Sequence, residues 1–170
     1  MKSIKRGQRA LIAMALLCLA PVVAAWLAYA LLPPGGGRSY GQLLPTHPFA
    51  ASGQPEWPRG KWVLASVLGA DCHNRCRQRW YAMRQIERAQ GEAASRLTRV
   101  ALLVSPRAAA MDDVPHRLPH ISAQALPAGN QGFYLVDPLG NQVMFYQDGA
   151  DPRRIIDEVA KVLKVNNGLG

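Results

Sequence analysis

Two cysteines separated by three residues are the part of this sequence best suited to chemistry. They stand in the segment CHNRC as Cys72 and Cys76. A cysteine pair with this spacing can form a redox-active dithiol, a clamp for a soft metal ion or a structural disulfide. The structural disulfide is the weaker interpretation, because so small a loop restricts the unfolded chain little. The pair therefore favours thiol exchange or metal binding.

The cysteines stand at the beginning of a segment with helical periodicity. Trp80, Met83 and Ile86 follow them at helical spacing and continue the same side of a helix. Cys72 is therefore expected at or near the N-cap, where unpaired backbone N–H groups and the helix dipole favour an anion. Such a position lowers the pKa of a thiol and makes thiolate available near neutral pH. Thiolates also bind Cu(I), so the same pair would suit copper.

Three histidines could supply a further metal ligand: His73, His116 and His120. His73 is adjacent to Cys72, but the side chains of neighbouring helical residues diverge, so joint ligation is strained. His116 and His120 are four residues apart, and Pro119 opposes a helical pair of ligands. We predict all three to be weaker candidates than the cysteines.

Arginines are the other prominent residues of the predicted helix. They stand at Arg75, Arg77, Arg79, Arg84 and Arg88. The simplest interpretation is a solvated helix face, and docking onto an acidic protein patch or onto lipid is the sharper alternative. The sequence contains no paired-carboxylate site, phosphate loop or serine nucleophile motif.

Short apolar segments predict the strands that position the cysteines. Residues 61–68 and 98–105 predict buried strands, which should be parallel because a helix joins them. Residues 132–137 and 142–147 predict an antiparallel hairpin across the turn PLGN. Residues 106–131 contain several prolines and predict irregular structure.

A second helix is predicted near the C-terminus. Asp151 suits its N-cap and Pro152 its first position. Its apolar side is formed by Ile155, Ile156, Val159, Val162 and Leu163. The order of elements predicts an α/β fold, a thioredoxin-like mixed sheet of four strands with helices on both faces. That architecture places its redox site at the strand-to-helix junction where the cysteine pair stands.

The N-terminus predicts a single transmembrane helix. Residues 10–32 contain no charged residue and can span about 30 Å of hydrocarbon. The apolar region of a cleaved signal peptide has only about 7–15 residues, so an uncleaved anchor is the better interpretation. Basic residues precede this segment and predict a cytoplasmic N-terminus with an exported domain. Cys18 is interpreted as a small apolar residue of the helix, in preference to a lipid-attachment site.

Charge and composition complete the predicted organisation. The net charge is +9, but export past a membrane argues against nucleic acid and favours anionic headgroups or an acidic partner protein. The predicted regions are a basic cytoplasmic N-terminus (1–9), a transmembrane anchor (10–32), a Pro/Gly-rich tether (33–59), a thioredoxin-like domain (60–166) and a tail (167–170).

Two segments resemble the Sco/SenC family. They are GKWVLASVLGADCHNRC and, much later, FYLVDPLGNQVMFY, followed by the amphipathic helix. The similarity covers about residues 60–165, and the chain resembles the small Sco-like proteins of proteobacteria that accompany oxidase assembly genes. The resemblance implies a membrane-anchored, thioredoxin-like protein of cytochrome c oxidase biogenesis. It would lie in the bacterial inner membrane as a single-pass protein with a periplasmic domain.

The resemblance also implies that the cysteine pair matches the family's copper-binding and redox cysteines. The family's third copper ligand is a histidine just before the strand predicted over 132–137. Asn130, Gln131 and Gly132 occupy this place here. The family's Pro-Asp between the cysteines is also replaced, by His-Asn. These departures favour thiol exchange or transient Cu(I) handling over stable Cu(II) binding.

Three functions are therefore considered, in this order. The first is an assembly factor for a respiratory oxidase that delivers Cu(I) or keeps copper-site cysteines reduced. Its partner would be an oxidase subunit or another copper or thiol assembly factor. The second is a general thiol-disulfide oxidoreductase, although the usual two-residue spacer is absent, as is a proline immediately before the 132–137 strand. The third is a non-catalytic docking module. A classical enzyme is not expected.

Overall fold

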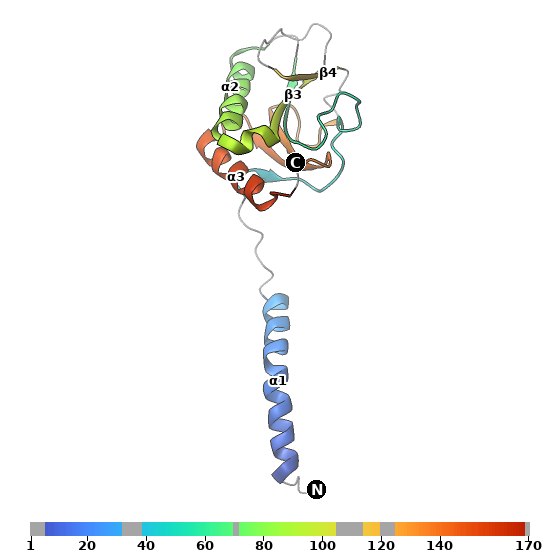
Figure 1. Cartoon of the computed structure of the whole chain (residues 1–170), viewed down its shortest axis with the longest axis vertical. Coiled ribbons are helices and arrows are strands. Elements are labelled where there is room, and N and C mark those ends of the chain that lie inside the picture. Colours follow the sequence, from blue (N-terminus) through green and yellow to red (C-terminus); the bar gives the residue numbers. More distant parts are fainter. Residues whose placement is uncertain (1–5, 32–38, 70–71, 105–113, 120–124, 169–170) are drawn as a thin grey trace. The chain divides into compact units, whose positions relative to one another are not determined.

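The computed structural model describes residues 6–31, 39–69, 72–104, 114–119 and 125–168 (Figure 1). The chain divides into two compact units, Met1–Arg38 and Ser39–Gly170. The first contains a single helix, and the second contains a mixed sheet with its helices.

The sheet of the second unit has six strands in the order β1-β6-β5-β2-β3-β4. Their bounds are Gln42–Leu43 (β1), Trp62–Leu68 (β2), Leu97–Leu103 (β3), His116–Pro119 (β4), Gly132–Val136 (β5) and Gln142–Gln147 (β6). β2 is parallel to β3 and antiparallel to β5, and β5 and β6 are antiparallel. This confirms the predicted mixed sheet.

Two strands were not predicted from the sequence. β4 lies within the proline-containing region expected to be irregular and pairs in parallel with β3. β1 has two residues and pairs with β6. Both lie at the edges of the sheet. Such short edge strands are too brief to show the period-two alternation by which a strand is predicted, so only their neighbours define them.

The helices are α2 (Asn74–Ala89) and α3 (Pro152–Val165), with the 3-10 helix η1 (Gly91–Arg96) after α2. α2 and α3 pack together (Figure 1). Both bury apolar residues in one cluster against one face of the sheet. Both described helices of this unit thus cover the same face of the sheet, and the segment between β3 and β4 that could form a further helix (105–113) lies outside the described residues.

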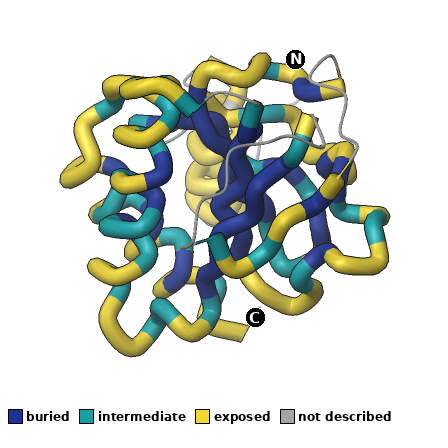
Figure 2. The backbone as a smooth tube through the Cα atoms, turned by 90° about the horizontal axis from the view of Figure 1, so that it is seen from above, coloured by how far each residue is buried: buried dark blue, intermediate teal, exposed yellow. Residues whose placement is uncertain are grey.

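The central strand β2 contributes to both faces of the sheet. Trp62, Leu64 and Leu68 belong to the cluster under the helices, whereas Val63 and Val67 belong to a second cluster. This alternation follows the period-two geometry of a strand. All seven residues of β2 are buried, and the strands form the dark core of Figure 2. The sheet therefore gives the residues that follow β2 a rigid base.

The second cluster is covered by residues that the sequence assigned to the tether. Phe49 and Trp57 are 2% and 4% exposed, and the ring centroid of Phe49 lies 5.2 Å from that of Tyr134. The interpretation of 33–59 as a tether without a core is therefore corrected for residues 39–59. A Gly- and Pro-rich composition predicts turns, but burying two large aromatic rings still stabilises those turns against the sheet.

Residues at the beginning of this unit are attached to α3 through one carboxylate. The backbone N–H groups of Tyr40 and Gly41 donate to Glu158 Oε1 and Oε2 at 2.7 and 2.9 Å. The hydroxyl of Tyr146 donates to the same Oε2 at 2.9 Å. Burial, with a smaller effect of the Glu158 charge, raises the pKa of Tyr146 above its ordinary value. Glu158 therefore joins three segments of the unit.

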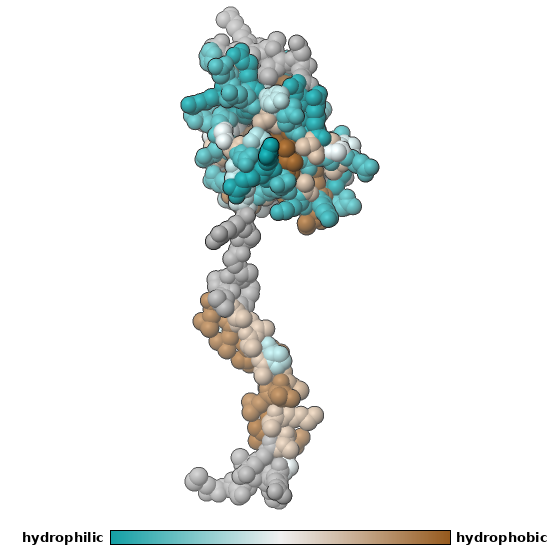
Figure 3. Space-filling view, turned by 90° about the vertical axis from the view of Figure 1, so that its left-hand side faces the viewer, coloured by the Kyte–Doolittle hydropathy of each residue, from teal (hydrophilic) through white to brown (hydrophobic). Residues whose placement is uncertain are grey.

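The N-terminal unit contains α1 (Arg6–Leu31) with Pro21 inside it. Its surface is apolar (Figure 3), and Leu17, for example, is 77% exposed. Within the described residues, Ala10–Ala28 is the one segment long and apolar enough to cross a membrane. This is the helix predicted over residues 10–32.

Candidate redox site

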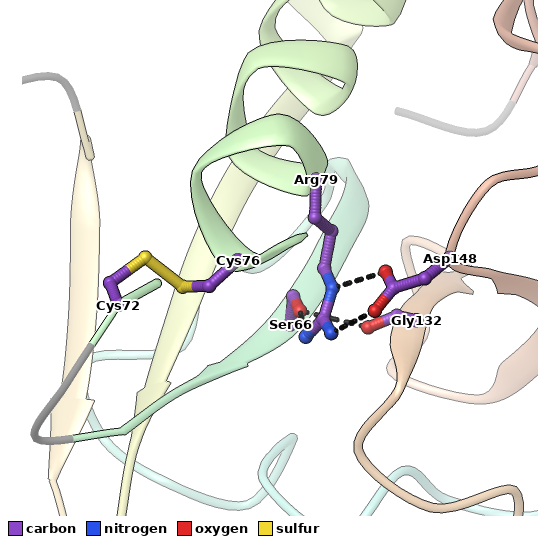
Figure 4. Close-up of polar contacts among 6 residues, drawn as sticks. All are labelled: Ser66, Cys72, Cys76, Arg79, Gly132 and Asp148. Atoms are coloured by element: carbon purple, nitrogen blue, oxygen red, sulfur yellow. Dashed lines mark hydrogen bonds and ion pairs between the residues drawn. A yellow bond between two sulfur atoms is a disulfide. The ribbon is translucent and has the colours of Figure 1, made fainter. Parts of the chain in front are cut away.

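The two cysteines form a disulfide at the junction between β2 and α2 (Figure 4). The Cα atoms of Cys72 and Cys76 lie 5.1 Å apart. Both residues are partly buried and pack against the apolar cluster under the helices. The pair therefore lies at the strand-to-helix junction where the sequence placed it, between the end of β2 at Leu68 and the first turn of α2.

The beginning of α2 has neither a side-chain cap nor an acidic residue in its first turn. Its N-cap is His73, whose side chain makes no capping hydrogen bond, and its first turn contains no acidic residue. Cys76 is the third residue of the helix. The positive end of the helix dipole therefore lies close to the cysteine pair, and no residue of the first turn of α2 supplies a carboxylate against it. In the reduced state this favours the thiolate over the thiol.

The histidines do not complete a metal site in the described residues. His73 is exposed at the N-cap. His116 begins β4 opposite Val100, which itself pairs with Ala65. His116 is thus two strands away from β2, about 10 Å across the sheet. His120 lies outside the described residues.

The donor atoms at the disulfide suit a copper ion in one oxidation state only. Within the described ranges, no group of three His, Cys, Asp or Glu residues could hold a metal ion. Two thiolates from one helical turn fit Cu(I), which accepts soft sulfur ligands. They lack the nitrogen ligand that would favour Cu(II).

A polar network that the sequence did not predict lies beside the disulfide. Arg79 Nε donates to Asp148 Oδ1 at 2.6 Å, and its Nη2 donates to the second carboxylate oxygen. Arg79 Nη1 donates to the hydroxyl of Ser66 at 3.1 Å, and this hydroxyl donates to the carbonyl of Gly132 at 2.8 Å. The network joins α2, β2, β5 and the turn after β6 (Figure 4).

Arg79 corrects the interpretation of the helix arginines as a solvated face. Its side chain is 8% exposed and that of Asp148 is 19% exposed. Arg75, Arg77 and Arg88 are exposed as expected. Arg79 could have been recognised because it stands three residues after Cys76, on the side of the helix that also carries the buried apolar residues.

Gly132 lets the backbone of β6 approach β5 closely at this site. A Cβ atom at Gly132 would lie 2.1 Å from the carbonyl oxygen of Tyr146 and 2.6 Å from the ring of Phe145. No side chain fits there. Asn130 and Gln131, which precede it, are exposed. These residues occupy the place where the resemblance leads one to expect a histidine.

The comparisons with known proteins agree with this architecture. Residues 62–166 match the family model described as "Transmembrane-like, thioredoxin-like, C-terminal domain". The chain belongs to this family. A search of the curated proteins gives no match. Family membership thus confirms the thioredoxin-like fold predicted from the order of strands and helices.

Solved structures of Sco proteins share the fold of this family member. One is Arabidopsis thaliana ScoI with copper bound, at 17% identity and a TM-score of 0.51, covering 63% of this chain and 86% of that chain. Another is a SCO1/SenC family lipoprotein from Bacillus anthracis str. Ames, at 17% identity and a TM-score of 0.51, covering 74% and 95%. The predicted resemblance to Sco/SenC proteins is therefore confirmed at the level of fold.

Proposed function

We propose that this protein is a membrane-anchored assembly factor for a respiratory cytochrome c oxidase. It acts through the Cys72–Cys76 dithiol on the copper-site cysteines of an oxidase subunit or of another assembly factor. The observation that carries the proposal is the disulfide at an uncapped helix start in a thioredoxin-like domain. The similarity in fold to Sco proteins, one of them solved with copper bound, supports it.

The redox step is a dithiol–disulfide exchange. The thiolate of one cysteine attacks a sulfur of the partner's disulfide, which forms a mixed disulfide and releases one partner thiolate. The second cysteine then attacks the mixed disulfide, releases the second partner thiolate and closes the Cys72–Cys76 bond. Two electrons and two protons pass to the partner. A thiol reductant outside the membrane must restore the dithiol.

Copper enters this proposal as cargo. Two thiolates can hold Cu(I), and the described residues offer no third ligand group. A two-sulfur site suits brief transfer of Cu(I) to a partner with more ligands. The same scarcity of ligands favours a second candidate function, a general thiol-disulfide oxidoreductase that carries no metal.

We further propose that the protein lies in the bacterial inner membrane. The N-terminus would be cytoplasmic, because basic residues precede the apolar helix Ala10–Ala28. The dithiol domain would be periplasmic, a compartment in which disulfides form and persist.

The test is a Cu(I) titration of the reduced full-length chain in detergent micelles against a coloured Cu(I) chelator. The matched control is the double variant Cys72→Ser/Cys76→Ser. One-to-one binding lost in the control supports copper transfer. Absence of binding, with reversible reduction of the disulfide, supports action on cysteines alone. Unchanged oxidase activity in cells that carry only the double variant would contradict both copper transfer and thiol exchange as the function.

The rate of turnover on different disulfide substrates distinguishes a general oxidoreductase from an oxidase assembly factor. A general oxidoreductase should reduce or oxidise unrelated disulfide substrates catalytically, whereas an assembly factor should act on the oxidase copper-site sequence preferentially. Equal rates with both substrates would favour the general function.

A further inference from the structure

A groove lined by both polar and apolar residues, but by neither cysteine, lies beside the beginning of α2. Its volume is about 900 Å³, and it lies between α2, the residues before β5 and the turn after β6. Arg75, Gln78 and Arg79 line it from the helix. Arg75 stands between the two cysteines in sequence, and Figure 4 shows the disulfide and Arg79 projecting to different sides of the helix. A partner that covers the end of α2 therefore meets both features.

The walls of the groove carry amide groups that are available for binding. They belong to Gln78, Asn130, Gln131 and Gln147, and all four residues are exposed. None of these side-chain amides has a hydrogen-bond partner among the described residues. An amide side chain both donates and accepts, so several of them in one groove can bind the N–H and C=O groups of an extended polypeptide.

The charged side chains among the described residues that line the groove carry a net positive charge. Asp148 lines the groove, but its carboxylate is held by Arg79 on both oxygens. Arg75 is exposed and has no ion-pair partner in the described part of the chain. The first turn of α2 adds no acidic residue and presents the positive end of its dipole. An occupant with carboxylates would complement this charge.

We propose that this groove binds an acidic polypeptide segment of the protein whose cysteines the dithiol serves. The inference rests on the proposed thiol function and names a recognition element for it. A concave wall of amides fits a chain segment better than a planar layer of lipid headgroups. Arg75 would contact the carboxylates, and the Arg79–Asp148 pair would form a neutral part of the wall.

The experiment uses the full-length chain in phosphatidylcholine nanodiscs, reduced beforehand and freed of reductant. The probes are two synthetic peptides with the same internal Cys-x3-Cys disulfide, flanked either by aspartates or by lysines. In a single turnover the protein dithiol becomes a disulfide and the peptide disulfide becomes a dithiol. Acid quenching, alkylation and mass spectrometry give the rate for each peptide.

The expected preference of the wild-type protein for the acidic peptide is about tenfold. Arg75→Glu should abolish or invert this preference. Arg77→Glu is the matched control, because Arg77 is exposed on the same helix turn and does not line the groove. It should retain at least half of the preference. For each variant, the rate with neutral 2-hydroxyethyl disulfide provides the baseline by which peptide rates are divided.

Each other outcome overturns a defined part of the proposal. Equal losses in both variants would assign the preference to the general positive field, and no preference in the wild type would remove the groove as a determinant. If Arg75→Glu, but not Arg77→Glu, weakens only the binding of phosphatidylglycerol vesicles, the occupant is lipid. If the wild type reduces neither the peptides nor 2-hydroxyethyl disulfide, the proposed thiol function itself fails.

Discussion

The two helices that pack side by side on the sheet begin in opposite ways. α3 begins at Asp151, whose side chain accepts from the N–H of Arg153 at 3.0 Å, with Pro152 in its first position. α2 begins at His73 without a side-chain cap. α3 therefore has a satisfied, structural beginning, whereas α2 leaves its N–H groups and dipole available to sulfur.

The uncapped helix is secured at a different point. The Arg79–Asp148 pair joins α2 to the turn directly before α3 across 69 positions of the sequence. The disulfide, by contrast, spans only four positions. The long-range contact can hold the helix in both redox states, so the covalent bond is free to open during thiol exchange. Five variants or conditions test this contrast between the capped α3 and the uncapped α2. They are given in order of decreasing expected effect on stability.

Asp148→Ala should have the largest effect. It leaves the guanidinium of Arg79 buried without its carboxylate, which costs about 3 kcal/mol of unfolding free energy. Chemical unfolding of the full-length chain measures the loss. Asp157→Ala is the control, because Asp157 is exposed on α3 and should change the free energy by less than about 0.5 kcal/mol. Equal effects of the two variants would show that the buried pair does not hold α2.

Reduction of the disulfide should cost less. A loop closed by residues four apart contributes at most about 2 kcal/mol in the chain-entropy description. Unfolding curves with and without a thiol reductant measure the difference, and Cys72→Ser/Cys76→Ser should reproduce it. Unfolding of the domain on reduction alone would contradict the idea that the ion pair secures the helix.

Alkaline pH should weaken the attachment of α3 to the sheet. Burial raises the pKa of Tyr146 above its ordinary value of 10.0, so the folded state keeps a proton that the unfolded chain loses. This contribution is complete below pH 10 and is lost above it, by about 1.4 kcal/mol per pH unit. Tyr146→Phe should show a shallower decline than the wild type in unfolding at pH 10–12. Tyr81→Phe, at an exposed position, should retain the wild-type slope.

Asp151→Ala removes the cap of α3. The expected loss is about 1 kcal/mol of unfolding free energy, because one N–H group of the first turn loses its acceptor. His73→Ala makes the corresponding change at α2 and should have almost no effect, since His73 makes no capping bond. Similar losses in the two variants would remove the contrast between the helices.

His73→Asp should give α2 the kind of cap that α3 has. We expect a stabilisation of about 0.5 kcal/mol together with slower thiol exchange, because a carboxylate at the helix start raises the pKa of the nearby thiols. The pH dependence of alkylation of the reduced protein measures this pKa. His73→Asn, a neutral cap, should stabilise the helix with a smaller change in thiol pKa. An unchanged alkylation profile in both variants would show that the open helix start does not activate sulfur.

The same contrast explains what the sequence could predict. Local rules give the cap at Asp151, the parallel pair of β2 and β3 and the hairpin of β5 and β6, because each depends on neighbouring residues. They also place the cysteine pair at the junction after β2. The network of Ser66, Arg79 and Asp148 was missed because it joins residues that only the folded sheet brings together.

Residues 39–59 are a second case in which contacts between distant parts of the sequence could not be predicted. Their composition predicts turns correctly, but composition carries no information on where a turn will pack. Phe49 and Trp57 are buried because they pack on the second face of the sheet, in the cluster that includes Tyr134 and Phe145. Only the folded sheet supplies the surface on which this predicted tether packs.

The crowding at Gly132 has a consequence for the evolution and engineering of copper sites on this domain. A Cβ atom there would collide with the backbone oxygen of Tyr146, so no single substitution at this position can install an imidazole without displacing the hairpin. The neighbouring positions Asn130 and Gln131 already carry exposed side chains, so the backbone accepts an imidazole there without this collision.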